Sequence, residues 1–211
     1  MINYYKHERN EIIDSIPFPI KRVLDIGCGE GFFAEKIKNK FNAEVWGIEI
    51  NEKSSIISAK KIDKVLFGDI NDMIDKLPKN YFDCIFFNDV LEHLVDPYSI
   101  LLKIKENLYD KKSIIISSIP NLRHYYVLKN LVINKNFDYV SDGILDKTHL
   151  RFFTKNSIIK MFEELDYKII KIQGINPLRS RKFELLNFLL FNFIDDTRYL
   201  QFLSIVSKND Y

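Results

Sequence analysis

The chain has 211 residues, of which 46% are hydrophobic and 28% charged, with a formal net charge of +2 at pH 7. This composition is typical of a globular protein with a hydrophobic core and excludes an intrinsically disordered chain, and the small net charge gives no argument for nucleic-acid binding. The two cysteines lack metal-ligand spacing, so reduced thiols are expected. The N-terminal stretch lacks the apolar core of a secretory signal, and no apolar segment is long enough to span a bilayer, so a cytoplasmic location is expected.

Strand-like and helix-like segments alternate along the chain. Strands are expected at 21–26, 44–49, 64–68, 82–87 and 113–119, and helices near 31–40, 51–61, 71–77 and 97–109. A further helix begins at Thr154, and two last strands are expected at 167–175 and 202–207. This alternation predicts an α/β fold, with a parallel sheet covered by helices on both faces, in one domain over residues 1–211.

The first strand runs directly into a glycine-rich loop. Val23 to Gly31 reads V-L-D-I-G-C-G-E-G, and a helix-like segment follows. Glycines accept positive φ and carry no Cβ, so the backbone can approach a ligand, and the helix N-terminus offers unpaired N–H groups. A dinucleotide fingerprint needs a small residue where Phe32 stands, which argues against a nicotinamide-dependent oxidoreductase. Asp25, just before the loop, suits the ammonium group of an amino acid better than a pyrophosphate.

Three later strands also end in polar residues. Glu49 closes the second strand, where a carboxylate can accept hydrogen bonds from both hydroxyls of a ribose. Asp69 follows the third strand, and Asn88 and Asp89 follow the fourth. These positions all lie at carboxyl ends of parallel strands, where open α/β sheets bind their ligands.

In these four motifs the chain resembles the class I S-adenosylmethionine-dependent methyltransferases, including the small-molecule enzymes of sugar, natural-product and ubiquinone biosynthesis. The resemblance implies a Rossmann-like, seven-stranded, mostly parallel sheet, with the last strand antiparallel between the fifth and sixth. It implies S-adenosyl-L-methionine as cofactor and S-adenosyl-L-homocysteine as product. In that family the aspartate after the third strand accepts from the adenine amine, and the next apolar residue packs on the ring. The residues expected to bind the cofactor are Asp25, Gly27, Cys28, Gly29, Gly31, Glu49, Ile50, Asp69, Ile70, Asn88 and Asp89, with the Cys28 thiol packing rather than reacting.

Three segments outside this core are expected to face the acceptor, at about 1–18, 120–153 and 177–199. A helix is expected over 3–15, either covering the pocket or simply capping the sheet. The segment after the fifth strand concentrates polar, aromatic and imidazole groups, and its stretch from Gly143 to Thr154 resembles one common in methyltransferases of sugar, surface-polysaccharide and natural-product pathways. The residues predicted to bind the acceptor are Tyr5, Arg9, Asn121, Arg123, His124 and Arg151.

A hydroxyl acceptor must lose its proton, which requires a base with a pKa near neutrality. His149 is the first candidate because it lies in the acceptor segment beside Arg151, and His93, next to Glu92, is the second. The alternative for each histidine is a helix cap or a satisfied hydrogen-bonding partner, and for Arg151 a salt bridge that pins the loop. No pattern indicates a metal site, including a magnesium site of the catechol type.

The sequence therefore predicts methyl transfer to a hydroxyl of a small molecule, first a sugar or nucleotide-sugar in surface-polysaccharide or natural-product biosynthesis. A quinone or phenol O-methyltransferase would share the cofactor half but would need an apolar slot for the ring. A non-catalytic protein that binds S-adenosylmethionine would keep affinity for the cofactor without turnover.

The segment 183–194 is apolar almost all round, so a helix there needs burial on more than one side. It is too short to cross a bilayer. The favoured interpretation is a helix in the core or in a homodimer interface, between the last two strands. The alternative is a helix on a membrane surface, with the basic residues Arg179, Arg181 and Lys182 facing lipid headgroups.

Overall fold

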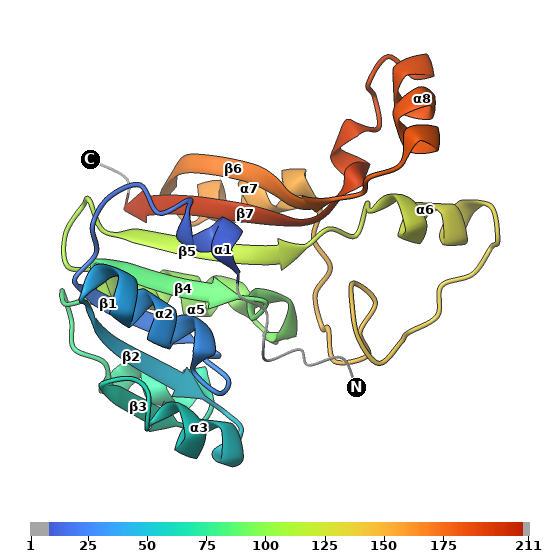
Figure 1. Ribbon diagram of the computed structural model, residues 1–211. Coiled ribbons are helices and arrows are strands. Elements are labelled where there is room, and N and C mark those ends of the chain that lie inside the picture. The colour runs from blue at the N-terminus through green and yellow to red at the C-terminus, as the bar shows by residue number, and fades with distance from the viewer. Residues whose placement is uncertain (1–8, 209–211) are drawn as a thin grey trace.

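A twisted seven-stranded sheet forms the centre of the computed structural model, which describes residues 9–208 (Figure 1). Its strand order is β3-β2-β1-β4-β5-β7-β6. The strands are β1 (Arg22–Ile26), β2 (Glu44–Glu49), β3 (Lys64–Phe67), β4 (Cys84–Asn88), β5 (Ile114–Pro120), β6 (Tyr167–Pro177) and β7 (Tyr199–Lys208). All neighbours pair in parallel except β7, which is antiparallel to both β5 and β6. The predicted Rossmann-like sheet with an antiparallel last strand is confirmed.

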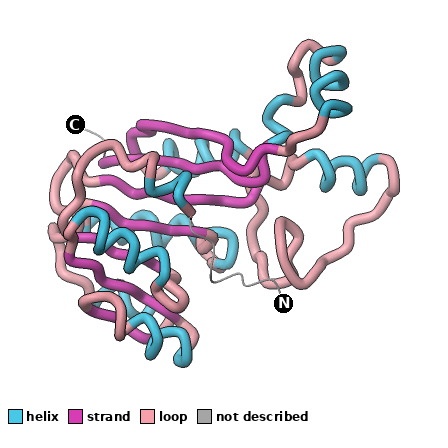
Figure 2. Tube along the Cα trace, in the orientation of Figure 1, coloured by secondary structure: helices cyan, strands magenta, loops and turns pink. Residues whose placement is uncertain are grey.

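Helices connect the strands and lie on both faces of the sheet (Figure 2). They are α1 (Asn10–Ile13), α2 (Phe32–Phe41), α3 (Glu52–Ser58), α4 (Ile70–Met73), α5 (Pro97–Ile104), α6 (Tyr125–Val132), α7 (Lys155–Glu164) and α8 (Arg181–Leu189). Short 3-10 turns are η2 (Ile74–Lys76), η3 (Leu91–His93), η4 (Lys105–Asn107) and η5 (Asp195–Arg198). Among the residues described, no helix has the length and apolarity that a bilayer crossing requires.

Local sequence signals explain the helix starts better than the helix lengths. Asp96 caps α5 by accepting from Ser99 N at 3.1 Å, and Thr154 forms a reciprocal capping box with Ser157 at the start of α7. The helix expected over 97–109 instead ends at Ile104 and continues as η4. Of the N-terminal helix expected over 3–15, the described part of the chain contains only α1, and residues 1–8 lie outside it.

Alternation along the strands divides the core into two apolar clusters. In β4, Ile85 and Phe87 face the cluster that includes α5 and α7, whereas Cys84 and Phe86 face the cluster that includes α1 and α2. All four side chains are fully buried. A strand that is apolar on both faces is expected in the middle of a parallel sheet with helices on either side. This packing fixes the strand ends from which the functional residues project.

Two helices extend beyond the carboxyl ends of the parallel strands, α6 after β5 and α8 between β6 and β7 (Figure 1). They meet near their N-terminal ends, where the rings of Tyr125 and Phe183 lie 5.5 Å apart. Phe183 is buried, but Phe191 and Phe193 are 94% and 81% exposed. The prediction of a core helix over 183–194 is therefore wrong, because the segment leaves the sheet and most of its large apolar side chains stay exposed. The large side chains left exposed at this tip are Leu185, Leu186, Phe188, Leu189, Leu190, Phe191 and Phe193, which we call the apolar tip.

Candidate functional site

The glycine-rich loop between β1 and α2 is held in a conformation that only glycine adopts readily. Gly27, Gly29 and Gly31 have φ angles of 70°, 54° and 79°. A Cβ on Gly27 would lie 2.7 Å from Val90 Cγ2, so the loop also packs directly against the segment after β4. The backbone N–H of Gly27 donates to the Ile48 carbonyl at 2.8 Å. A side chain on Gly27 would displace the neighbouring chain, and the close backbone approach predicted for a ligand stays a prediction.

Glu49 ties this loop to the end of β2. One carboxylate oxygen accepts from Gly29 N at 2.7 Å and the other from Asn51 N at 2.7 Å. The side chain is 7% exposed. Both carboxylate oxygens thus lie at the carboxyl edge of the sheet, and each keeps further lone pairs for a hydroxyl donor.

Asp25 is a buried carboxyl group next to the loop. It is 3% exposed, and burial raises its pKa from 3.8 to about 7, with Glu49 adding to the rise and Arg9 opposing it. A cationic group bound beside Asp25 would favour its ionised form. The ammonium contact expected of Asp25 stays a prediction.

The other residues predicted to bind the cofactor include one helix cap, one exposed side chain and two buried ones. Asp69 caps α4, and its Oδ1 accepts from Asn71 N at 2.8 Å. Ile70 is buried, whereas Ile50 is 66% exposed at the end of β2. Burial raises the pKa of the Cys28 thiol, which packs against Ser58. The adenine contacts expected of Asp69 and Ile70 stay predictions.

Asp89 joins residues from four parts of the chain. It has a positive φ of 53°, and its Oδ2 lies 2.7 Å from Arg9 Nη2. Its Oδ1 accepts from Ser118 Oγ at 3.3 Å and from Gln201 Nε2. The sequence assigned Arg9 to the acceptor and Asp89 to the cofactor, but the structure joins them in one ion pair. Ser118 and Gln201 were not predicted, because only the sheet order brings β5 and β7 to this point.

Two buried polar groups beside Asp89 lack partners within residues 9–208. Asn88 Nδ2 donates no hydrogen bond there, and Asn88 Oδ1 and both carboxylate oxygens of Glu92 accept none. Glu92 is 1% exposed, and burial, with a contribution from Asp89, raises its pKa well above the usual value. Buried polar atoms without partners are uncommon in folded proteins and often mark the place of a ligand or ion.

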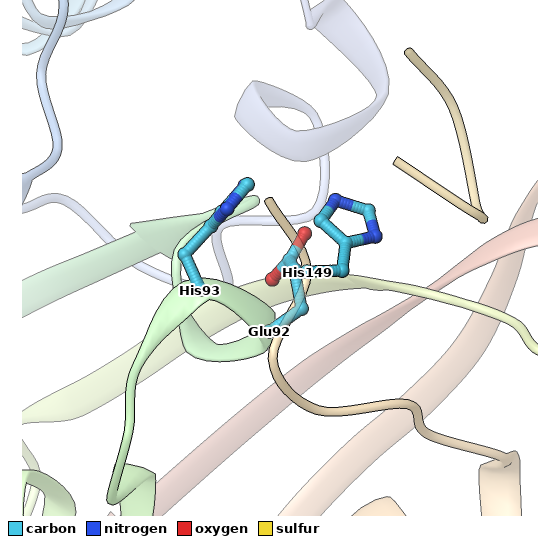
Figure 3. A group of neighbouring side chains, drawn as sticks. All are labelled: Glu92, His93 and His149. Carbon is cyan, nitrogen blue, oxygen red and sulfur yellow. The ribbon is translucent and has the colours of Figure 1, made fainter. Parts of the chain in front are cut away.

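His93 and His149, predicted as candidate bases, come together at the end of β4. Their ring centroids are 4.7 Å apart and the rings meet edge to face. The backbone N–H groups of Leu150 and Arg151 donate to the Glu92 carbonyl at 2.8 and 2.9 Å, which holds the segment around His149 against η3. Figure 3 shows the Glu92 side chain next to the two imidazoles, and one ligand atom of each of the three side chains lies within 4.8 Å of the others. Burial and the neighbouring His149 lower the pKa of His93.

Three predicted acceptor-binding residues make contacts that organise the chain. Asn121 is fully buried and donates to the carbonyls of Asp196 and Tyr199 at 2.9 and 3.0 Å. Arg123 Nε lies 2.8 Å from Asp196 Oδ2. Arg151 donates to the Leu150 and Val95 carbonyls, so it holds the loop through backbone carbonyls and not through the salt bridge that the alternative expected.

Of the other two residues predicted to contact the acceptor, the structure describes His124 but not Tyr5. Tyr5 lies outside the described residues. His124 lines a cavity of about 350 Å³ between α6 and the loop that follows it. Much of the lining is apolar and includes Val127, Ile144 and Leu200. The Ile144 carbonyl contacts His149 Nδ1 at 2.9 Å, so the cavity adjoins the segment that carries His149.

Comparisons with known proteins give a consistent assignment. A family described as "Methyltransferase domain" matches residues 1–172. A ubiquinone biosynthesis O-methyltransferase of Idiomarina loihiensis is 26% identical over 169 residues, which cover 76% of this chain and 68% of that protein. The mitochondrial protein of that name from Schizosaccharomyces pombe is 25% identical over 175 residues, covering 78% and 62%. Among solved structures, a SAM-dependent methyltransferase from Archaeoglobus fulgidus has a TM-score of 0.71 at 23% identity, covering 94% of this chain and 92% of that one.

Proposed function

Because the chain belongs to the methyltransferase-domain family, as a class I S-adenosylmethionine-dependent enzyme, we propose that it methylates a hydroxyl oxygen of a small molecule. The observation that supports this proposal most directly is the histidine pair at the carboxyl end of β4. His93 and His149 lie beside the buried, unpartnered carboxylate of Glu92, and Val90 of the same segment packs against the glycine loop. Groups able to take a proton thus adjoin the predicted cofactor site.

The cofactor end of the site fits S-adenosylmethionine in its shape and its charges. The bound cofactor supplies an activated methyl group on a sulfonium centre. Gly27, Gly29 and Gly31 give the backbone room for close approach, and we assign Asp25 to the ammonium group and Glu49 to the ribose hydroxyls. The unpartnered amide of Asn88 is available to the methionine end.

The residues at the acceptor end align the acceptor and take its proton. In the transfer, the acceptor oxygen forms a bond to the methyl carbon while the bond from that carbon to sulfur breaks. The hydroxyl proton passes to an imidazole nitrogen, for which we propose His149 first and His93 second. The products are a methyl ether and S-adenosylhomocysteine. The burial of His149, which is 7% exposed, helps to keep water from the reacting atoms.

A sugar or nucleotide-sugar is the first acceptor class that we propose. The segment from Gly143 to Thr154, which carries the sugar-pathway resemblance, also carries His149 and docks on η3. Polar groups accompany it, including Asp146, which accepts from Thr148 N at 2.7 Å. A polyhydroxylated acceptor would find hydrogen-bonding partners along this segment.

A phenol or quinone-derived acceptor is the second candidate, and the cavity beside α6 favours it. The apolar side chains of the cavity, with the polar groups of His124, Asn130, Asn136 and Asp138 at the wall, suit a hydroxylated aromatic ring. Relatives named ubiquinone biosynthesis O-methyltransferase match three quarters of the chain. The two candidates differ in whether the acceptor fills this cavity.

An acceptor panel separates these proposals. The purified protein would be incubated with S-adenosylmethionine and either nucleotide-sugars or catechols and dihydroxylated quinol analogues, with S-adenosylhomocysteine release as the readout. Val127→Trp, which fills the cavity, should abolish turnover of a phenolic acceptor and spare that of a sugar. If S-adenosylhomocysteine binds but neither class turns over, the proposed hydroxyl methylation is contradicted and the non-catalytic alternative is favoured.

The apolar tip is the surface on which the expected membrane or homodimer contact would form. We propose a membrane surface, because three exposed basic residues at and just before the start of α8 suit anionic headgroups. They are Arg179, Arg181 and Lys182. The test is flotation with vesicles that contain or lack phosphatidylglycerol, using Phe191→Ser/Phe193→Ser as the variant. A dimer in solution that the same variant dissociates, without vesicle binding by the native protein, would contradict the membrane proposal. A cytoplasmic location stays a prediction.

A further inference from the structure

Glu92, His93 and His149 form the one group of three potential metal ligands that the described residues bring together. One ligand atom from each side chain lies within 4.8 Å of the other two. Glu92 and His93 are neighbours in η3, whereas His149 comes from the loop before α7 (Figure 3). The loop is held to η3 through the Glu92 carbonyl, so backbone hydrogen bonds already fix the separation of the two segments.

The hydrogen bonds of both imidazoles leave Nε2 free to bind an ion. His149 Nδ1 lies 2.9 Å from the Ile144 carbonyl, which only accepts, so we place the proton on Nδ1 and a lone pair on Nε2. His93 Nδ1 lies 3.2 Å from the Thr148 carbonyl, and the nearby Thr148 hydroxyl donates to Asp146. His93 is therefore assigned the same tautomer. Histidines that bind metals usually donate their second nitrogen to a carbonyl or carboxylate in this way.

Glu92 supplies the carboxylate. Its side chain is 1% exposed, and within residues 9–208 no group donates a hydrogen bond to either of its oxygens. The guanidinium of Arg9 pairs with Asp89 instead, at 2.7 Å. A carboxylate buried without donors is costly unless a cation meets it. A divalent ion between the three side chains would satisfy both oxygens and the two nitrogen lone pairs.

We propose that Glu92, His93 and His149 bind a divalent transition-metal ion. Two imidazoles and one carboxylate suit Zn²⁺, Mn²⁺ or Fe²⁺, whereas Mg²⁺ prefers a shell of oxygen ligands. Around such an ion, ligand atoms at about 2.1 Å from the metal lie roughly 3.4 Å apart, so the present spacing closes by small side-chain rotations. Three protein ligands leave coordination positions open at the end of β4.

An acceptor hydroxyl could occupy one of these open coordination positions, and this part of the inference rests on the proposed function. An acceptor hydroxyl that binds to the ion would have a lower pKa, so it would ionise without a strong base. Both histidines would then act as ligands rather than as proton acceptors. The binding of the ion itself does not depend on which acceptor is used.

Titration of the metal-free protein with Co²⁺, Zn²⁺, Mn²⁺ and Mg²⁺ tests the proposal, using calorimetry and, for Co²⁺, visible absorption. We expect one Zn²⁺ and one Co²⁺ per chain, with Co²⁺ absorption bands that show nitrogen ligation, and binding of Mg²⁺ at least a hundredfold weaker. His149→Gln and Glu92→Gln should each weaken Zn²⁺ binding at least tenfold. His124→Gln is the matched control, because His124 is also a buried histidine but lies outside the cluster, and it should keep the native Zn²⁺ affinity.

The native protein alone decides the proposal if the variants fail to fold. Absence of a stoichiometric Zn²⁺ or Co²⁺ site in native protein overturns it, as does an equal loss of affinity in His124→Gln. Binding of S-adenosylhomocysteine is measured on the same sample. Cofactor binding without metal binding would refute the metal site and leave the proposed methyl transfer intact, whereas metal binding without methyl transfer to any acceptor would refute only the proposed function.

Discussion

Replacement of Asp25 by asparagine should stabilise the protein at high pH while it weakens cofactor binding. Asparagine keeps the shape of the side chain and removes its charge. The pKa of Asp25 is raised from 3.8 to about 7, so the folded chain holds this proton more tightly than the unfolded chain does. Native stability therefore falls as the pH rises from about 4 to 7, and the variant lacks this fall.

The size of the effect follows from the two pKa values. At about 1.36 kcal/mol for each pKa unit, ionisation of Asp25 costs roughly 1.7 kcal/mol of native stability at pH 5 and roughly 4.3 kcal/mol at pH 8. The free energy of unfolding of Asp25→Asn, relative to native protein, should thus rise by about 2.5 kcal/mol between these pH values. Loss of a charge-assisted hydrogen bond should weaken S-adenosylhomocysteine binding at pH 8 by about 1.5–3 kcal/mol.

Urea unfolding of both proteins at pH 5 and pH 8, with calorimetric titration at pH 8, measures both effects. Asp63→Asn is the control, because the pKa of Asp63 is lowered despite its desolvation, through the Lys38 ammonium and the Val45 N–H. That contribution changes only below about pH 5, so the control should differ from native protein by the same amount at both pH values. A pH-independent difference for Asp25→Asn would refute the reasoning about burial, and unchanged cofactor affinity would refute the role of Asp25.

Three further predictions concern the same site. Glu49→Gln should weaken S-adenosylhomocysteine binding by about 1.5–3 kcal/mol, as measured by calorimetry, and an unchanged affinity would exclude the ribose contact. His149→Ala should leave that affinity nearly unchanged and lower kcat by at least a hundredfold, and full activity of the variant would remove His149 from the mechanism. If His93 takes the proton, kcat should stay level from pH 8 to about pH 6.5 and fall only under more acidic conditions, because burial and His149 lower the pKa of His93; a fall centred above pH 7 in a stopped assay would exclude His93 as that base.

The positions of the residues predicted to bind the cofactor could be predicted from the sequence because each motif is local, whereas their contacts with the cofactor stay predictions. Asp25 and the glycines lie within a few residues of one strand end, and Glu49 closes the next strand. Parallel sheet geometry then brings these ends to one edge without further information. The positive φ angles of Gly27, Gly29 and Gly31 confirm the tight turn that their spacing indicates.

The acceptor half depends on contacts between distant segments, which no local pattern records. His93 and His149 were each predicted alone, but their pairing requires the loop before α7 to dock on η3. Asn121 and Arg123 look like binding residues in the sequence, yet they fix η5 and the start of β7. The apolarity of residues 183–194 indicated burial, whereas the chain places them beyond the sheet, where nothing within residues 9–208 covers the tip.

The sheet order has a consequence for the way the chain assembles. β6 pairs with β7 and with no other strand of the described sheet, although β7 is made later and separated from β6 by α8. During synthesis, β6 cannot join the sheet until β7 has been made, although α7 can already pack into the core with β4 and α5. Closing that connection is a non-local step, which is expected to be slow compared with formation of the β1–β5 region. Until it closes, the β5 edge is available to chaperones or to other chains, and a truncation that removes β7 would leave β6 without a partner in the sheet.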